Sequence, residues 1–263
     1  MDRRLAWTIL SDAAKAPSRT LERLRAGRTA EKVFAIGFNK SGTTSLHEIF
    51  QKLGYHSYHG IKWRDVSKPA IYYFYDAFCD DIPSDFRRLD AKFPNAKFLL
   101  QVRSLDAWLD SRLEHIRRLP PGKKRHPNWS MKESSVQIWT RLWNEHHIEV
   151  LRYFRDRPDD LLLLNYIREP DAANRIAAFL GRAERLDKPH ANANPDADAG
   201  RTLKHRGMIT AALNGLGIPE SEWGNDIHCP SISGVDPAEI PVDTVRGASA
   251  MGQTGTAAPR SGL

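Results

Sequence analysis

The sequence is poor in cysteine and has no long hydrophobic run. Cys79 and Cys229 are the only two cysteines among 263 residues and lie far apart, which excludes a disulfide framework. Apolar runs such as Leu161 to Leu164 fall far short of the roughly 20 residues that a membrane-spanning helix needs. The stretch from Leu5 to Leu10 is too short for a signal-peptide core, and no small-residue cleavage site follows it. We therefore expect a cytoplasmic protein with no transmembrane segment.

Metal-binding patterns are missing as well, whereas positive charge is in excess. No carboxylate and histidine residues show the spacing of a metal site, so we expect no metal. The formal net charge is +7, and residues 112–127 hold six basic residues against Glu114 alone. Such a cluster attracts anionic molecules, although an ordinary solvated loop has the same composition. No nucleic-acid-binding motif surrounds it, so no nucleic-acid partner is expected.

Short apolar runs alternate with helical patterns along the middle of the chain. We expect strands at 33–36, 55–59, 97–102 and 160–165, whereas 71–78 fits either a helix or a strand. Helices are expected over 43–53, 84–93 with Ser84 as a cap, 104–119, 130–157 and 170–180. This alternation predicts an α/β domain of three layers, with a central parallel sheet flanked by helices.

The chain divides into three parts by composition. Residues 1–30 form a basic N-terminal arm, and residues 31–190 form the α/β domain. Residues 191–263 form a C-terminal extension that is rich in small and polar residues and is expected to be largely disordered toward its end. In the long helix from Ser130, the expected apolar face consists of Ile138, Leu142, Ile148, Leu151 and Phe154. His146 and His147 lie in the middle of that helix, where a structural role is expected.

The most informative segment follows the apolar run 33–36. Gly37 ends this run, and hydroxyl residues open the helix that is expected from residue 43. Unpaired N–H groups at a helix N-terminus attract anions, and glycines let the backbone approach them closely. Lys40 adds a positive charge. The sequence therefore predicts an anion-binding loop, which we call the Lys40 loop, made of Asn39, Lys40, Ser41, Gly42, Thr43, Thr44 and Ser45.

The spacing within this loop departs from that of nucleoside triphosphatases. In their loop, G-x-x-x-x-G-K-[ST], a lysine follows the second glycine. Gly37 and Gly42 have the matching separation, but Thr43 follows Gly42 and Lys40 lies inside the loop. The next clear strand runs into Arg103 and not into an aspartate. A nucleotide-dependent kinase of P-loop architecture is therefore disfavoured and is kept as an alternative.

Two motifs together resemble a known family. Lys40-Ser41-Gly42-Thr43-Thr44 resembles the 5′-phosphosulfate loop of sulfotransferases that use 3′-phosphoadenosine 5′-phosphosulfate (PAPS). In that family a strand ending in Arg, with Ser about two helical turns later, binds the 3′-phosphate of the donor. Arg103 and Ser111 reproduce that spacing. Over roughly residues 31–195 the chain is similar to bacterial-type sulfotransferase-like proteins.

The resemblance implies a P-loop nucleoside-triphosphatase-like sulfotransferase fold, PAPS as the donor co-substrate and no required metal. Lys40 would be catalytic, because it can neutralise the charge of the leaving nucleotide. The acceptor needs a base. His59 is our first choice, because it follows an expected strand and would lie at the carboxyl edge of the sheet. The alternatives for this base are Asp76, Asp80 and Asp81.

Several points stay open at the level of sequence. The sulfuryl acceptor, a hydroxyl or an amine, is not defined, and a homodimer is compatible with the chain. The element with which cytosolic family members close over the 3′-phosphate is absent, and the basic segments 117–125 and 204–206 are candidates to replace it. His190 could touch donor or acceptor. A non-catalytic nucleotide-binding relative is the third reading of the chain.

Overall fold

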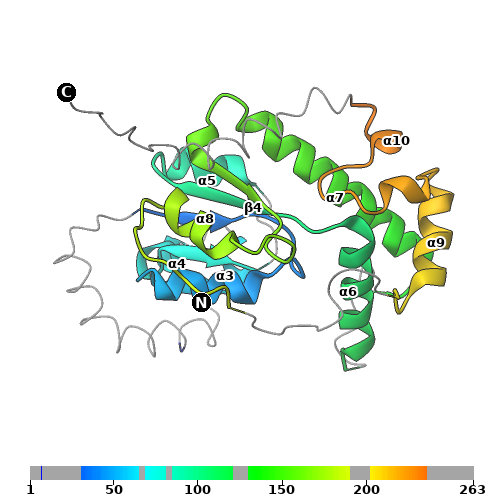
Figure 1. Cartoon of the computed structure of the whole chain (residues 1–263), viewed down its shortest axis with the longest axis horizontal. Helices are drawn as coiled ribbons and strands as arrows, with labels where there is room; N and C mark the ends of the chain where they lie inside the picture. Colours follow the sequence, from blue (N-terminus) through cyan, green and yellow to red (C-terminus); the bar gives the residue numbers. More distant parts are fainter. Residues whose placement is uncertain are drawn as a thin grey trace, which may run out of the picture.

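The computed structural model describes Trp7 and residues 31–64, 69–80, 85–120, 130–189 and 202–235. In this part of the chain, five parallel strands form one sheet in the order β2-β3-β1-β4-β5 (Figure 1). The strands are β1 (Val33–Ala35), β2 (Ser57–His59), β3 (Ala77–Cys79), β4 (Lys97–Gln101) and β5 (Leu161–Leu164). The expected parallel sheet is confirmed. Apart from Trp7, the predicted arm at 1–30 lies outside the described residues.

Helices cover both faces of the sheet (Figure 1). They are α3 (Thr43–Lys52), α4 (Pro69–Phe74), α5 (Phe86–Lys92), α6 (Leu105–Arg118), α7 (Glu133–Tyr153), α8 (Ala172–Phe179), α9 (Arg206–Gly215) and α10 (Pro230–Ser233). Short 3₁₀ helices occupy Ile61–Arg64, Pro158–Asp160 and Glu220–Glu222.

Alternation along the strands produces two separate cores. Phe34 of β1 packs in one core with residues of α5 and α7, whereas its neighbours Val33 and Ala35 pack in the other with residues of α3 and α8. Successive side chains of a strand point to opposite faces, so a strand buried on both faces is apolar throughout. The expected three-layer α/β architecture is confirmed.

The ambiguous segment 71–78 contains both elements. Helix α4 ends at Phe74, and β3 begins at Ala77. Strand β3, which lies between β1 and β2 in the sheet, is therefore the strand that sequence periodicity could not distinguish from the helix before it. The next helix, α5, is capped by Asp85, whose side chain accepts a hydrogen bond of 3.2 Å from the N–H of Arg88. The predicted cap, Ser84, lies outside the described residues.

The buried face of α7 differs from the prediction. Ile138 and Leu142 are 43% and 48% exposed, whereas Trp139 and Trp143, one position further along, are buried. An indole ring buries more apolar area than a branched aliphatic side chain, so the tryptophans determine the rotation of the helix about its axis. The remaining expected residues are buried as predicted: Ile148, Leu151 and Phe154.

A third core lies beside the sheet, where α6, α7 and α9 meet (Figure 1). It joins residues of the sheet domain to residues after 190, where the sequence signal fades. Its buried members include Trp108, Leu109, Leu113, Trp139, Trp143, Ile209, Leu213 and Trp223. The packed part of the chain therefore extends to at least residue 235, beyond the boundary expected near 190.

A buried ion pair lies just outside the amino edge of the sheet. Lys32 precedes β1 and Asp76 precedes β3, and Lys32 Nζ lies 3.2 Å from Asp76 Oδ1. Lys32 Nζ also donates to the carbonyl of Tyr75 at 2.6 Å, and Asp76 accepts from the N–H of His56 at 3.2 Å. The pair therefore holds the starts of β1, β2 and β3 together.

Asp76→Ala should lower the free energy of unfolding by about 3–5 kcal/mol, because it removes the carboxylate that pairs with the buried Lys32 ammonium group. Urea unfolding followed by circular dichroism measures this loss. The control is Glu149→Ala, which removes the partner of Arg87 in a pair whose side chains are 48% and 57% exposed. That change should cost less than about 1 kcal/mol. Equal losses in the two variants would contradict the assigned role of Asp76.

Candidate functional site

The Lys40 loop follows β1, and side chains from three other elements hold its backbone. His146 of α7 donates from Nε2 to the carbonyl of Ile36 at 2.7 Å. Trp108 of α6 donates from Nε1 to the carbonyl of Asn39 at 2.9 Å, and Arg103, just after β4, donates to the carbonyl of Lys40 at 2.9 Å. These three carbonyls are thereby turned toward the body of the protein.

The N–H groups of the loop, unlike its carbonyl groups, are mostly without a partner in the described part of the protein. Ser41 Oγ donates to the carbonyl of Phe38 inside the loop, and the N–H of Gly37 donates to Gln101 Oε1 at 3.0 Å. Within the described residues, no backbone N–H from residue 39 to residue 45 donates to a protein acceptor. Unpaired N–H groups at the start of α3, together with the helix dipole, are the features with which a loop can hold an anion.

Two left-handed residues shape the loop. Lys40 has φ 68° and Gly42, the N-cap of α3, has φ 97°. A Cβ added at Gly42 would lie 2.7 Å from the ring of Tyr166, so glycine is required there for space as well as for conformation. Alternating handedness in a short segment brings successive N–H groups to one side. The helix that follows is continuous from Thr43.

The remaining hydroxyl residues of the predicted site differ in burial. Thr43 and Ser45 are 6% and 4% exposed, whereas Thr44 is half-buried. Ser45 hydrogen-bonds to the side chain of Tyr166, and burial, more than this bond, determines the pKa of Tyr166, which is raised to about 12. Thr43 and Thr44 are therefore better placed for a ligand than Ser45.

His59 ends β2 and lies against the Lys40 loop. Its Nε2 is 3.4 Å from Thr43 Oγ1. His47, from the second turn of α3, packs beside it with the two ring centroids 5.6 Å apart, and His47 Nδ1 is 2.8 Å from Ser57 Oγ. Burial first, and the neighbouring His59 second, lower the pKa of His47 to about 4. His47 is therefore neutral near pH 7.

The three aspartates considered as bases lie in different places. Asp76 precedes β3 at the amino edge of the sheet, where it pairs with Lys32, so its position does not suit the predicted catalytic role. Asp80 directly follows β3 at the carboxyl edge, and its charge acts on Lys40. Asp81 and also His190 lie outside the described residues.

Charged groups surround the Lys40 side chain. Burial is the largest influence and lowers the pKa of Lys40, Asp80 raises it, and Arg112 and Arg118 of α6 lower it further. His115, on the same helix, has its pKa lowered by burial and then by Lys40 and the two arginines. One face of α6 is therefore directed toward the Lys40 loop. At about 100° per residue, Ser111 lies on this face between His115 and Arg118.

Arg112 is a site residue that sequence reasoning did not identify. Its Nη1 donates to Asn39 Oδ1 at 3.2 Å, and its guanidinium lies 4.7 Å from the ring centroid of Trp139. Trp108, four residues earlier on α6, holds the carbonyl of the same Asn39. A tryptophan and an arginine at i, i+4 spacing after Arg103 were the signal in the sequence that could have identified Arg112.

His146, for which a structural role was expected, has a specific one. It holds the backbone before the Lys40 loop through the carbonyl of Ile36.

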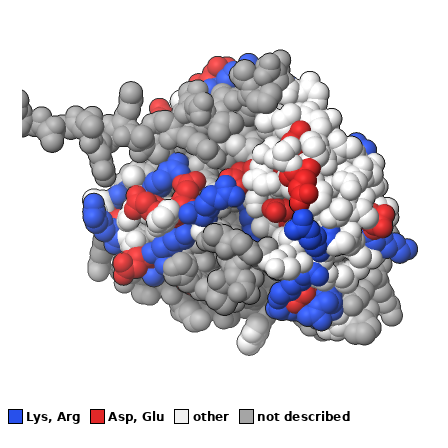
Figure 2. All heavy atoms as spheres, turned by 45° about the vertical axis from the view of Figure 1, so that its right-hand side comes forward, with Lys and Arg blue, Asp and Glu red and all other residues white. Residues whose placement is uncertain are grey.

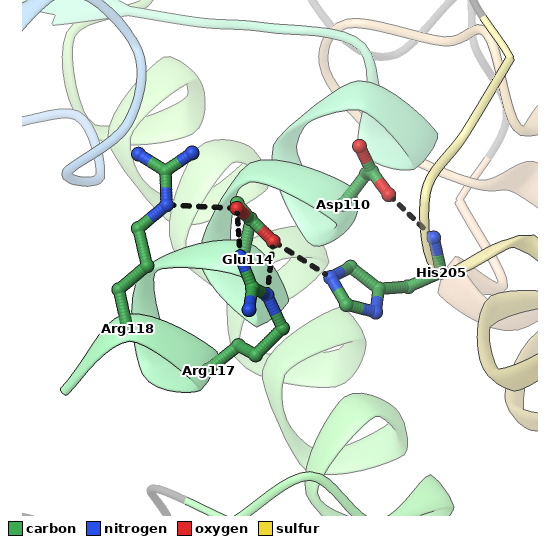
Figure 3. A network of polar contacts seen from close by, with 5 residues as sticks. All are labelled: Asp110, Glu114, Arg117, Arg118 and His205. Atoms are coloured by element: carbon green, nitrogen blue, oxygen red, sulfur yellow. Dashed lines mark hydrogen bonds and ion pairs between the residues drawn. The ribbon is translucent and has the colours of Figure 1, made fainter.

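The basic stretch of α6 is partly neutralised by its own glutamate. Glu114 accepts hydrogen bonds from Arg117 Nε at 2.8 Å and from Arg118 Nε at 2.7 Å (Figure 3). The hydrogen bond from Arg117, above all, holds the pKa of Glu114 far below its usual range. On the face drawn in Figure 2, Lys and Arg form separate groups with Asp and Glu among them. Residues 121–129 of the basic stretch lie outside the described part of the chain.

The same glutamate ties the segment 204–206 to α6. His205 Nε2 lies 3.4 Å from Glu114 Oε2, and the N–H of His205 donates to Asp110 Oδ1 at 2.8 Å (Figure 3). Arg206 pairs with Glu220 at 2.6 Å. The second candidate segment for closing over the 3′-phosphate is thus fixed on the helix that carries Ser111.

Gly37→Ala should damage the Lys40 loop. A Cβ at this position would lie 2.0 Å from the backbone carbonyl oxygen of Gln101, so β1 would have to separate from β4. We expect a loss of about 1–3 kcal/mol in urea unfolding, as for overpacked cores. Gly224→Ala, where the added carbon meets nothing within 4 Å, is the matched control and should change stability by less than about 0.5 kcal/mol. Equal stability of the two variants would show that the loop is not pressed against β4.

Neither a metal site nor a membrane-spanning helix is found among the described residues. No group of three or more histidine, cysteine or carboxylate residues there is arranged to hold a metal ion. None of the described helices combines the length and the hydropathy that a bilayer span requires.

Comparison with known proteins assigns the central part of the chain. Residues 63–169 match the family model of the sulfotransferase domain. The match includes β3, β4, α6, α7 and β5, and with them Asp80, Arg103 and Ser111, whereas the Lys40 loop and His59 precede its first residue. A search of curated proteins gives no match. Residues 63–169 therefore match a sulfotransferase domain, and this match supports a transferase enzyme.

Proposed function

We propose that this sulfotransferase uses PAPS as its donor and transfers the sulfuryl group to an acceptor hydroxyl or amine. The observation that carries the proposal is the Lys40 loop, where unpaired N–H groups, a half-buried lysine and two threonines meet beside an arginine. A ligand with phosphate and sulfate groups is complementary to this arrangement.

The 5′-phosphosulfate would lie in the loop. The N–H groups of residues 39–45 would donate to its oxygens, with Thr43 and Thr44 as further donors. Lys40 would bind the bridging oxygen, where negative charge builds as the nucleotide leaves. Since the carbonyls of Ile36, Asn39 and Lys40 are held by other side chains, they would not compete for the same face as the anion.

The 3′-phosphate would bind Arg103 and Ser111. Arg103 is 8% exposed, lies two residues after the end of β4, and donates from Nη1 to the carbonyl of Lys40. Its bond to the Lys40 carbonyl would couple the two ends of the donor site. The segment 204–206 would supply the closure over this phosphate, since its His205 is held on α6, the helix of Ser111, by Glu114 and Asp110.

Transfer would proceed by in-line displacement. The acceptor oxygen or nitrogen forms a bond to sulfur, while the bond between sulfur and the bridging oxygen breaks and the bisphosphate nucleotide leaves. His59 would take the acceptor proton, because its ring lies beside Thr43 at the edge of the loop.

Calorimetry with 3′,5′-adenosine bisphosphate and, separately, with ATP and Mg²⁺ tests the donor assignment. The bisphosphate should bind more tightly than ATP with Mg²⁺. Lys40→Ala and Arg103→Ala should each weaken it by about 10- to 100-fold, the equivalent of one charged hydrogen bond. Lys52→Ala is the matched control, because this exposed lysine lies at the other end of α3.

Preference for ATP with Mg²⁺ would instead support the kinase alternative and overturn the proposal. An equal loss of affinity in Lys52→Ala would mean that net charge alone attracts the nucleotide. Binding of the bisphosphate without sulfuryl transfer to any of a broad panel of hydroxyls and amines would favour the non-catalytic relative.

A further inference from the structure

Two residues stand out by backbone conformation. Among the described residues, only Lys40 (φ 68°) and Asp80 (φ 86°) adopt a positive φ without being glycine. A left-handed conformation costs free energy for any residue with a Cβ, although aspartate and asparagine tolerate it best. Strained residues of this kind cluster at functional sites. Lys40 belongs to the candidate functional site, so we ask whether the strained Asp80 serves the same site.

The sheet brings the segments that carry these two residues to the same edge. Strands β1 and β3 are parallel neighbours with Val33 opposite Ala77 and Phe34 opposite Phe78. Lys40 lies in the loop after β1, and Asp80 directly follows β3, so both leave the same carboxyl edge of the sheet. Opposite charges thus follow adjacent strands at one edge of the sheet, and the charge of Asp80 acts on Lys40.

Neighbouring elements fix the backbone of Asp80. Trp63, which is fully buried, donates from Nε1 to the carbonyl of Asp80 at 3.2 Å. The N–H of Gly60 donates to the carbonyl of Cys79 at 3.1 Å. These bonds hold the left-handed turn in place and present the Asp80 side chain at the sheet edge.

The charges near Lys40 explain what a carboxylate does there. Arg112 and Arg118 of α6 oppose a third positive charge, and burial also disfavours it. His115 lies on the same helix face, Arg103 binds the Lys40 carbonyl, and His59 lies beyond Thr43. Among the described residues, Asp80 is the acidic group whose charge raises the pKa of Lys40.

We propose that Asp80 is a positioning residue, which keeps the Lys40 amine charged beside the loop until the donor's anionic groups take over that role. The proposal rests on the proposed function, since it gives Lys40 the task of neutralising the leaving nucleotide. Without Asp80, burial and the surrounding cations would act on Lys40 unopposed and lower its pKa further, which weakens the preference for the charged amine that the leaving nucleotide requires.

An NMR titration of the lysine side chains tests this directly and requires no acceptor. The lysines are reductively methylated with ¹³C-formaldehyde, and the Lys40 signal is assigned from its loss in Lys40→Arg. In the unmodified sequence, the Lys40 midpoint should lie below the ordinary lysine value of 10.5. In Asp80→Asn it should fall further, because asparagine keeps the tolerance for positive φ and removes only the charge. Asp80→Gly, which relieves the strain altogether, should give the same shift.

The control is Asp156→Asn, which removes an exposed carboxylate between α7 and the amino end of β5, at the opposite edge of the sheet. It should leave the Lys40 midpoint unchanged. An unchanged or raised midpoint in both Asp80 variants would overturn the proposal, as would an equal fall in Asp156→Asn. Failure of the proposed function would show separately, as absence of bisphosphate binding in calorimetry, and would leave the titration readable.

Discussion

The site depends on one constraint, which is that the carbonyl groups of the Lys40 loop are turned away from the ligand side. A peptide unit carries its N–H and C=O groups in opposite directions, so the held carbonyls of Asn39 and Lys40 leave the N–H side of their peptides for an anion, whereas the N–H paired with the Ile36 carbonyl donates to Gln101. His146, Trp108 and Arg103 supply these holding bonds from α7, α6 and the end of β4. The arrangement of the loop backbone is therefore a tertiary property, although the residues of the loop are contiguous.

The sequence could predict much of the fold because the strands are buried on both faces. Their runs, such as Leu161 to Leu164, are continuously apolar, and this pattern survives any choice of neighbours. It could not separate α4 from β3, since both are short and aromatic and only pairing between β1 and β2 makes Ala77–Cys79 a strand. Nor could it orient α7, because two overlapping apolar stripes were available and the packing of Trp139 and Trp143 decided between them.

The residues of the candidate site also divide into those that the sequence could predict and those that depend on packing. Lys40, Arg103 and His59 are predictable to lie together because each follows a parallel strand, and the carboxyl ends of parallel strands share one edge. Arg112, Trp108 and His146 were not, since helix residues reach the loop only through the packing of α6 and α7. Asp80 was one of several candidates in the sequence, and its positive φ distinguishes it only once a backbone is known.

The order of the strands also limits how this protein can be shortened. The region that matches the sulfotransferase domain begins at residue 63, yet β1 lies in the middle of the sheet, between β3 and β4. A fragment cut to the matched limits would lose this central strand together with β2 and α3, and β3 would have no partner on either side. The smallest unit that can fold must therefore begin before Lys32, whose ion pair with Asp76 joins the starts of the first strands.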